Sequence, residues 1–210
     1  MNGIHIPSEE EFIRGIETFE RHEKRDAMYK VATFLVLQFW GKPSEMADGL
    51  GVLLLTWNQA FYRYGGFDFD KLEKCIEENL ERLESFRERN ITTLSENDEQ
   101  DIERIFNEFM ESLQIASGRR QGDKSPVAVA KALHLLAPNF FPLWDYQIAR
   151  AYGCNYNNNP AERYIQFMKV MKEFYEQIRN YNIPPKYSKD KTLLKLIDEY
   201  NYSKYTKKWI

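Results

Sequence analysis

The amino-acid sequence predicts an all-α fold, in the form of a compact multi-helix domain, and three observations carry this prediction. Apolar residues recur every three or four positions along most of the chain, which is the spacing of one face of an α-helix. Residues that favour helix ends, namely Ser, Asp, Pro and Gly, flank these apolar segments. No segment of real length alternates between apolar and polar residues, and the turn signals of β-hairpins are missing. We therefore expect one helical domain over residues 1–210, with enough length for two helical lobes and a cleft between them.

Five helices are expected in the first half of the chain. Each begins at or just after a residue that favours a helix start: Ser8, Asp26, Pro43, Asp70 and Ser95. Glu11 and Asp98 stand three residues after the two serines, which is the spacing of a capping box. Gly41 ends the second helix, and the pair Gly65 and Gly66 ends the third.

Four helices are expected in the second half. Ser125 and Pro126 form an N-cap and a first helical residue, and they predict a short helix to residue 137. Asp145 stands at the N-cap of the next helix, which Gly153 closes. A long amphipathic helix over residues 161–178 and a last helix over residues 193–205 follow.

The composition is that of a packed globular protein, with 43% hydrophobic and 15% aromatic residues. Cys75 and Cys154 form no CxxC motif or Cys/His cluster, so we expect no disulfide framework, no metal site and no cofactor. The N-terminus is acidic and lacks the apolar core of a signal peptide. The longest apolar stretches, residues 31–40 and 50–57, are far shorter than the roughly 20 residues of a membrane span. We expect a cytoplasmic protein without membrane contact, and we favour a monomer.

Charge is distributed unevenly along the chain. Residues 1–117 carry 13 Lys and Arg against 24 Asp and Glu, a balance of -11, whereas residues 118–210 carry 16 against 8, a balance of +8. The basic part is therefore suited to face a polyanion, while the acidic part keeps the protein soluble. The alternative is a solvated surface with uneven charge usage.

Asp145 is the leading candidate for a catalytic residue. Its neighbours Phe141, Leu143, Trp144 and Ile148 are apolar and would shield a carboxylate from water. A carboxylate in a dry pocket stabilises a positive charge that develops during a reaction, or acts as a base. The alternative is that Asp145 only caps its helix.

The segment from Gly122 to Gly153 carries an ordered pattern: Gly-Asp-Lys-Ser at 122–125, an apolar helix, Pro-Leu-Trp-Asp at 142–145 and a second helix that ends in Tyr-Gly. This pattern resembles the helix-hairpin-helix DNA glycosylase superfamily, in which a Gly/Pro-rich loop and a single Asp follow the hairpin. The resemblance implies that Asp145 is the catalytic carboxylate, which stabilises the positive charge on the sugar as an N-glycosidic bond breaks. It also places Arg150 at the arginine of the motif, as a residue that binds nucleic acid. The hairpin departs from the family, because Gly-Arg-Arg-Gln-Gly stands at 118–122, and the family's lysine position falls in register at Val127.

Two lysines and one histidine are further candidates for catalysis. Lys131 and His134 are three residues apart and share one face of the expected helix, amid apolar residues. A lysine in that place forms a Schiff base if burial lowers its pKa, and Lys124 is the second candidate for this role. Of the three histidines, His5, His22 and His134, only His134 is a candidate for catalysis. The alternative is a lysine that extends to solvent and a hydrogen-bonded core histidine.

Two other groups of residues suit a nucleic acid. Arg119, Arg120, Gly122 and Lys124, with the helix amides at Ser125, would bind a phosphate, or else form an exposed mobile loop. The side chains suited to hold an extruded base are Trp57, Asn58, Tyr62 and Trp144. At helical spacing, such residues are more often part of the core. The last residues, 202–209, mix cations with aromatic rings that suit a single strand, or else form a frayed tail.

The leading hypothesis is a DNA base-excision N-glycosylase that acts on a flipped modified or damaged base, in a duplex or a single strand. It would also nick the strand as a lyase if Lys124 or Lys131 reaches the sugar. The alternatives are a non-catalytic helical module that binds nucleic acid and a protein-interaction module.

Overall fold

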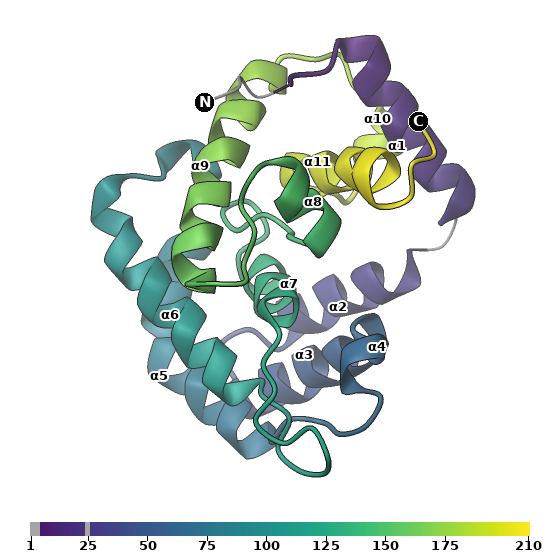
Figure 1. Ribbon diagram of the computed structural model, residues 1–210. Helices are drawn as coiled ribbons and strands as arrows, with labels where there is room; N and C mark the ends of the chain where they lie inside the picture. The colour runs from purple at the N-terminus through teal and green to yellow at the C-terminus, as the bar shows by residue number, and fades with distance from the viewer. Residues whose placement is uncertain (1–4, 24–25) are drawn as a thin grey trace.

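The computed structural model describes residues 5–23 and 26–210, and every regular element in these ranges is a helix (Figure 1). The predicted all-α class is therefore confirmed. None of the helices in this part of the chain combines the length and the apolar character that a membrane span requires.

The first half of the chain forms six helices. They are α1 (Glu9–His22), α2 (Ala27–Gln38), α3 (Pro43–Trp57), α4 (Gln59–Tyr62), α5 (Phe69–Arg87) and α6 (Glu99–Ser112). The second half forms five, with a final π-helical turn, η3. They are α7 (Pro126–Leu136), α8 (Tyr146–Ala151), α9 (Pro160–Ile178), α10 (Pro185–Ser188), α11 (Leu193–Asn201) and η3 (Tyr202–Thr206). The chain also makes two short 3-10 turns between α5 and α6, η1 (Ile91–Thr93) and η2 (Glu96–Asp98).

The predicted caps set several of the helix starts. Ser8 Oγ accepts the backbone N–H of Glu11 at 3.2 Å and begins α1. Ser125 Oγ accepts the backbone N–H of Ala128 at 3.2 Å and begins α7. Asp68 caps α5, two residues before the expected start at Asp70.

The third helix is shorter than predicted. It ends at Trp57, because Asn58 has a non-helical backbone with φ −116° and ψ 33°, and α4 follows as a single turn. The side-chain amide of Asn58 donates to Ser125 Oγ at 3.2 Å. A contact across 67 residues thus accompanies the break, and no local signal in the sequence marks it.

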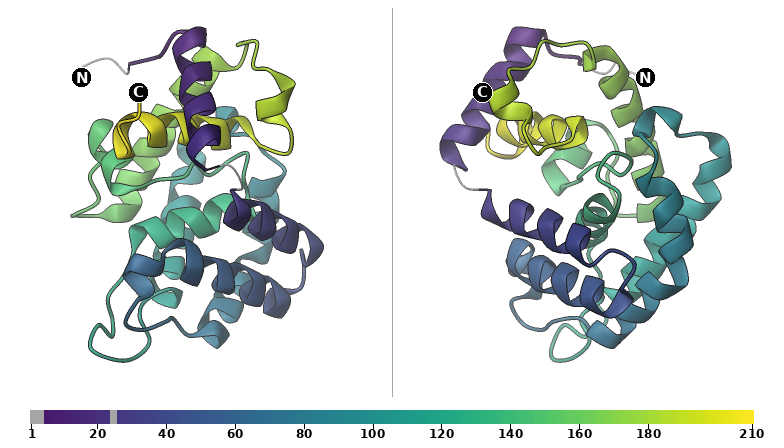
Figure 2. Two further views of the ribbon diagram at one scale, coloured as in Figure 1. Left: turned by 90° about the vertical axis from the view of Figure 1, so that its right-hand side faces the viewer. Right: turned by 180° about the vertical axis from the view of Figure 1, so that it is seen from behind.

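The helices form two groups joined by α6 and α7 (Figures 1 and 2). In one group, α3 packs against both α2 and α5. In the other, α1 packs against α11 and η3, while α8 contacts η3 and α9 contacts α11. Helix α1 and the C-terminal turn η3 therefore lie at the same end of the molecule (Figure 1).

Helix α7 lies in the middle of the fold and contacts α2, α3 and α6 (Figure 1). From Ala128 to Leu136 every residue except Lys131 is buried. Burial of this mostly apolar helix supplies much of the core. Lys131 is thus the one residue of this stretch whose side chain is partly exposed to solvent.

The two oppositely charged parts of the chain pair with each other in the fold. Among the described residues, six ion pairs join a cation from residues 118–210 to a carboxylate from residues 1–117: Lys124–Glu111, Lys169–Glu99, Lys186–Glu17, Lys191–Glu20, Lys195–Asp26 and Lys204–Glu11. Four of these connect the C-terminal region to α1 or to the residue before α2. Six of the 16 cations in residues 118–210 thus pair with the acidic half, and this part of the basic charge is not free to face a polyanion.

Candidate functional site

A cavity of about 660 Å³ lies where the two groups of helices meet. Its walls come from the end of α1, the start of α2, the end of α3, the middle of α7, the segment before α8, and α11 with η3. The volume is in the range of small-molecule sites. Lys131, Asp145, Trp57 and Trp144, all of them candidates from the sequence, line this one cavity.

Lys131 enters the cavity from α7. Its Nζ donates to the backbone carbonyl of Trp57 at 2.9 Å and lies 4.7 Å from the centre of the Trp57 ring. Burial lowers the pKa of Lys131 to about 8, although the nearby carboxylates of Asp198 and Asp145 oppose the shift. The neutral amine, which is the form that attacks a carbonyl or sugar carbon, is therefore more abundant near physiological pH than in an ordinary lysine.

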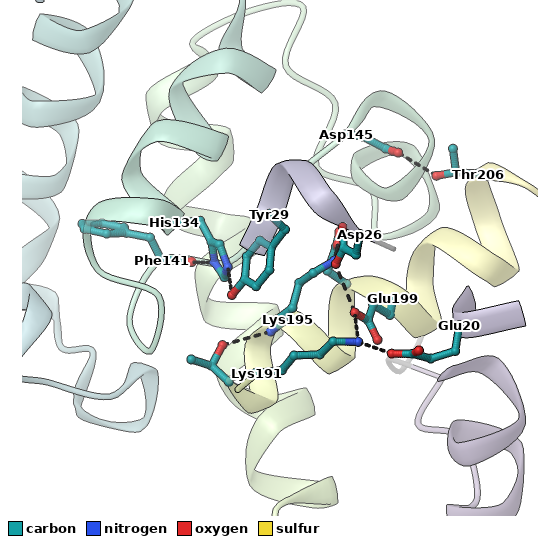
Figure 3. Close-up of polar contacts among 12 residues, drawn as sticks. Glu20, Asp26, Tyr29, His134, Phe141, Asp145, Lys191, Lys195, Glu199 and Thr206 are labelled. Carbon is teal, nitrogen blue, oxygen red and sulfur yellow. Dashed lines mark hydrogen bonds and ion pairs between the residues drawn. The ribbon is translucent and has the colours of Figure 1, made fainter. Parts of the chain in front are cut away.

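Asp145 reaches the cavity from the segment before α8. Its Oδ1 accepts the backbone N–H of Ile148 at 2.7 Å, so Asp145 is the N-cap of α8 as predicted. Its Oδ2 accepts the hydroxyl of Thr206 at 2.6 Å (Figure 3). The residue thus caps its helix and also presents a firmly oriented carboxylate to the cavity.

A buried charge cluster forms the floor of the site (Figure 3). Lys195, only 1% exposed, lies with its Nζ 3.4 Å from Asp26 Oδ2, 3.5 Å from Asp198 Oδ2 and 3.4 Å from Glu199 Oε1. Burial alone would lower the pKa of Lys195, but the three carboxylates outweigh burial and raise it. Lys195 therefore stays charged and acts as a fixed cation.

Asp198, another acidic residue of α11, lines the cavity. Burial raises the pKa of Asp198 to about 6, and the carboxylates of Asp145, Glu199 and Asp26 add to the shift while Lys195 opposes it. Groups with perturbed pKa values in a cavity are typical of functional sites. Asp198 and Lys131 both meet this description.

Aromatic side chains contribute unequally to the cavity wall. Trp57 is partly exposed and presents its ring beside Lys131. Trp144 is only 1% exposed, and its ring packs against Tyr164 at 5.3 Å and Phe167 at 6.0 Å between ring centres. Trp144 is thus mainly a core residue, which corrects its expected role as a stacking surface for a base.

Asn58 and Tyr62, the other expected base-pocket residues, do not line the cavity. Asn58 is bonded to Ser125, and the Tyr62 hydroxyl donates to the backbone carbonyl of Leu113 at 2.9 Å. Burial raises the pKa of Tyr62. The two side chains instead attach the region of α4 to Ser125 and Leu113. Of the expected base-pocket residues, Trp57 is therefore the one that offers a partly exposed ring to the cavity.

His134 also lies outside the cavity, fully buried beside it (Figure 3). Its Nδ1 is 2.8 Å from the carbonyl of Phe141 and its Nε2 is 3.3 Å from the hydroxyl of Tyr29. Burial lowers the pKa of His134 to about 3, so the ring is neutral. This geometry is that of the hydrogen-bonded core histidine named as the alternative.

The predicted phosphate-binding loop lies away from the cavity, between α6 and α7 (Figure 1). Lys124 pairs with Glu111, and Arg120 Nε donates to Asp123 Oδ2 at 2.7 Å. Gly122, with φ +87°, closes the loop by donating its N–H to the Ile115 carbonyl at 2.8 Å. Ser125 is buried as the cap of α7. Of the loop cations, only Arg119 is both exposed and outside the ion pairs formed by the described residues.

Arg150 is exposed on α8 and does not line the cavity. Asp26, Lys195 and Asp198, in contrast, were missed by the sequence analysis. A signal for two of them was present: Lys195 and Asp198 stand at i and i+3 within an apolar helix, together with Glu199, so they share a face that other helices cover.

Within the described ranges, no three His, Cys, Asp or Glu side chains gather as a metal site would require. Comparison with known proteins gave no match to a protein-family model, to a curated protein or to a solved structure.

Proposed function

We propose that the cavity is the active site of a base-excision N-glycosylase that works through Lys131 and Asp145. One observation carries the proposal: an amine with a lowered pKa and an oriented carboxylate reach the same cavity from two different segments. An amine and a carboxylate in a partly desolvated site are the groups that covalent cleavage of an N-glycosidic bond needs. The cavity volume suits an extruded nucleotide better than a polymer backbone.

Each residue has a defined role in this proposal. Asp145 stabilises the positive charge that develops on the sugar as the base departs. Lys131, as a neutral amine, attacks the anomeric carbon and forms an imine. Trp57 offers an aromatic wall for the extruded base.

Borohydride trapping on a duplex with an abasic site tests the covalent step. The wild-type protein should form a stable adduct with the DNA, and Lys131→Ala should lose it. Lys124→Ala is the matched control, because this lysine lies in the loop between α6 and α7 and should leave trapping intact. An adduct that survives Lys131→Ala and disappears in Lys124→Ala would overturn the assignment.

Asp145→Asn tests the carboxylate on a lesion duplex that the wild type cleaves. The substitution keeps the acceptor for Ile148 N–H but removes the charge, so we expect about a hundredfold slower release. Full activity in this variant would refute the mechanism. Salt-sensitive DNA binding without release of any base would instead indicate a binding module.

A second candidate, a protein-interaction module, is favoured by the exposed face of α2. Met28, Val31, Phe34 and Leu37 are 43–62% exposed, and Val52 of α3 is 56% exposed. Exposed apolar stripes mark contact surfaces. The only charged residue of α2 is Lys30, so two copies of this face would meet with little electrostatic repulsion. Sedimentation of the wild type and of Phe34→Ser tests this: a dimer that dissociates in the variant supports self-association, and a wild-type monomer excludes it.

A further inference from the structure

We propose that Asp198 is the general acid of the site and gives a proton to the departing base, while Asp145 stabilises the charge that develops on the sugar. This inference rests on the proposed N-glycosylase function and adds a catalytic residue that neither the sequence pattern nor the resemblance indicates. Protonation of the departing nitrogen speeds the release of a neutral base, and the acid that gives this proton must be a different group from the carboxylate that stabilises charge on the sugar.

The positions of the two carboxyl groups suit this division. Both line the cavity, Asp145 from the segment before α8 and Asp198 from α11, and Lys131 of α7 lines it as well. Both oxygens of Asp145 accept short hydrogen bonds, from the Ile148 N–H and the Thr206 hydroxyl, so this carboxyl group is placed as an acceptor. Among the described residues, the Asp198 side chain makes one hydrogen bond, a long one of 3.5 Å from Lys195 Nζ, and it keeps 15% of its surface exposed. Asp198 is therefore available to a ligand in the cavity.

Burial favours the protonated form of Asp198, and the charged groups around it act in both directions. They come from every element packed there: Lys195 and Glu199 on α11, Asp26 before α2, Lys131 on α7, Asp145 before α8, and Arg21, His22 and Glu23 at the end of α1. Burial is the largest effect and raises the pKa of Asp198 to about 6, with the neighbouring carboxylates acting in the same direction. The positive charge of Lys195 opposes burial and the carboxylates, so the pKa of Asp198 stays close to neutral pH and the side chain can both give and take a proton.

The proposed step balances in atoms and charge. The C–N bond to the base breaks, its electron pair stays on the base nitrogen, and that nitrogen takes the proton of Asp198. The Lys131 amine gives its lone pair to the anomeric carbon, and one amine proton passes through Asp198 to the ring oxygen as the ring opens to an iminium ion. Water then hydrolyses this ion, which returns the neutral amine and leaves the excess proton on Asp198.

Single-turnover base release by wild type and Asp198→Asn tests the proposal. The probes are duplexes that carry hypoxanthine or uracil as neutral bases, and 7-methylguanine as a base that is already cationic and departs without added protonation. Asp198→Asn should release a neutral base about a hundredfold more slowly and should release 7-methylguanine at nearly the wild-type rate. A merely structural role would slow both kinds of base equally. Asp123→Asn, in the distant loop, is the matched control.

The pH profile gives a second readout. Asp198 must be protonated and Lys131 neutral, so the rate on a neutral base should be greatest near pH 7, between pKa values of about 6 and about 8, and should fall on both sides. In Asp198→Asn the fall on the alkaline side should disappear.

The outcomes separate the two proposals. A wild-type protein that releases neutral bases, with an unchanged rate and profile in Asp198→Asn, overturns the role of Asp198 alone. Equal slowing on neutral and cationic bases does the same. Absence of release from all three duplexes, together with absence of borohydride trapping, overturns the N-glycosylase function and this inference with it.

Discussion

The hydroxyl of Thr206 donates a hydrogen bond of 2.6 Å to Oδ2 of Asp145 (Figure 3). The contact joins the π-helical turn at the end of the chain to a residue 61 positions earlier. It fixes the orientation of a carboxylate whose other oxygen is held by the cap of α8. The C-terminal turn is therefore part of the site.

Thr206→Val should slow borohydride trapping about tenfold. The substitution keeps the shape of the side chain and removes the donor, so Asp145 keeps one of its two restraints and adopts less well oriented positions. Each factor of ten corresponds to about 1.4 kcal/mol in the barrier. Thr206→Ser retains a hydroxyl and should restore most of the rate, whereas equal loss in both variants would show that packing of the methyl group matters instead.

The pH dependence of trapping should follow the Lys131 amine. Since burial lowers its pKa to about 8, imine formation at an abasic site should rise with pH and level off above that value. An ordinary lysine would still be gaining reactivity above pH 10. A plateau measured only above pH 10 would contradict the burial of this amine in solution.

Stability at low pH should depend on Glu11. Its carboxylate accepts hydrogen bonds from Lys204 Nζ at 2.6 Å and from the Tyr200 hydroxyl at 2.9 Å. The bond from Lys204 is the main reason that the pKa of Glu11 falls to about 2. A lowered pKa contributes stability above the unfolded value near 4.5, and this contribution disappears as the pH falls toward 2.

The urea midpoints of wild type and Glu11→Gln should therefore differ at pH 6 and converge toward pH 2. Glu10→Gln changes an exposed neighbour on the same turn and should leave the midpoint at its wild-type value throughout. A constant gap between wild type and Glu11→Gln at all pH values would show that ionisation of Glu11 is not the cause.

The elements that the sequence predicted well are those with local signals. Ser8, Ser125 and Asp145 all accept a backbone N–H three residues ahead, a geometry that needs only neighbouring atoms. The break between α3 and α4 was not predicted, because Asn58 is held by a residue far away in the chain.

In the candidate site, too, the sequence predicted the residues with local signals and missed those that depend on distant contacts. Sequence reasoning proposed Asp145 and Lys131 for the site, but it could not choose between Lys124 and Lys131, since the choice depends on how α7 lies against α3. Asp198 and Lys195 were missed because their burial arises only when α1 and α2 cover α11, and charged residues near the end of a chain are ordinarily solvated.

The buried carboxylate of Glu199 should be the most sensitive point of the charge cluster. It has no exposed surface, and its Oε1 lies 2.8 Å from Lys191 Nζ and 3.4 Å from Lys195 Nζ. Although burial raises the pKa of Glu199, both lysines oppose this effect and favour the charged form. Removing the charge leaves two buried or half-buried cations short of a partner, which costs about 3 kcal/mol or more.

Glu199→Gln should therefore lower the free energy of unfolding by that amount in urea titrations. Glu20→Gln removes the other carboxylate that pairs with Lys191. The Glu20 side chain is 35% exposed, so solvent screens its charge and the substitution should cost about 1 kcal/mol or less. Equal costs in the two variants would mean that burial of Glu199 does not govern the stability of the cluster.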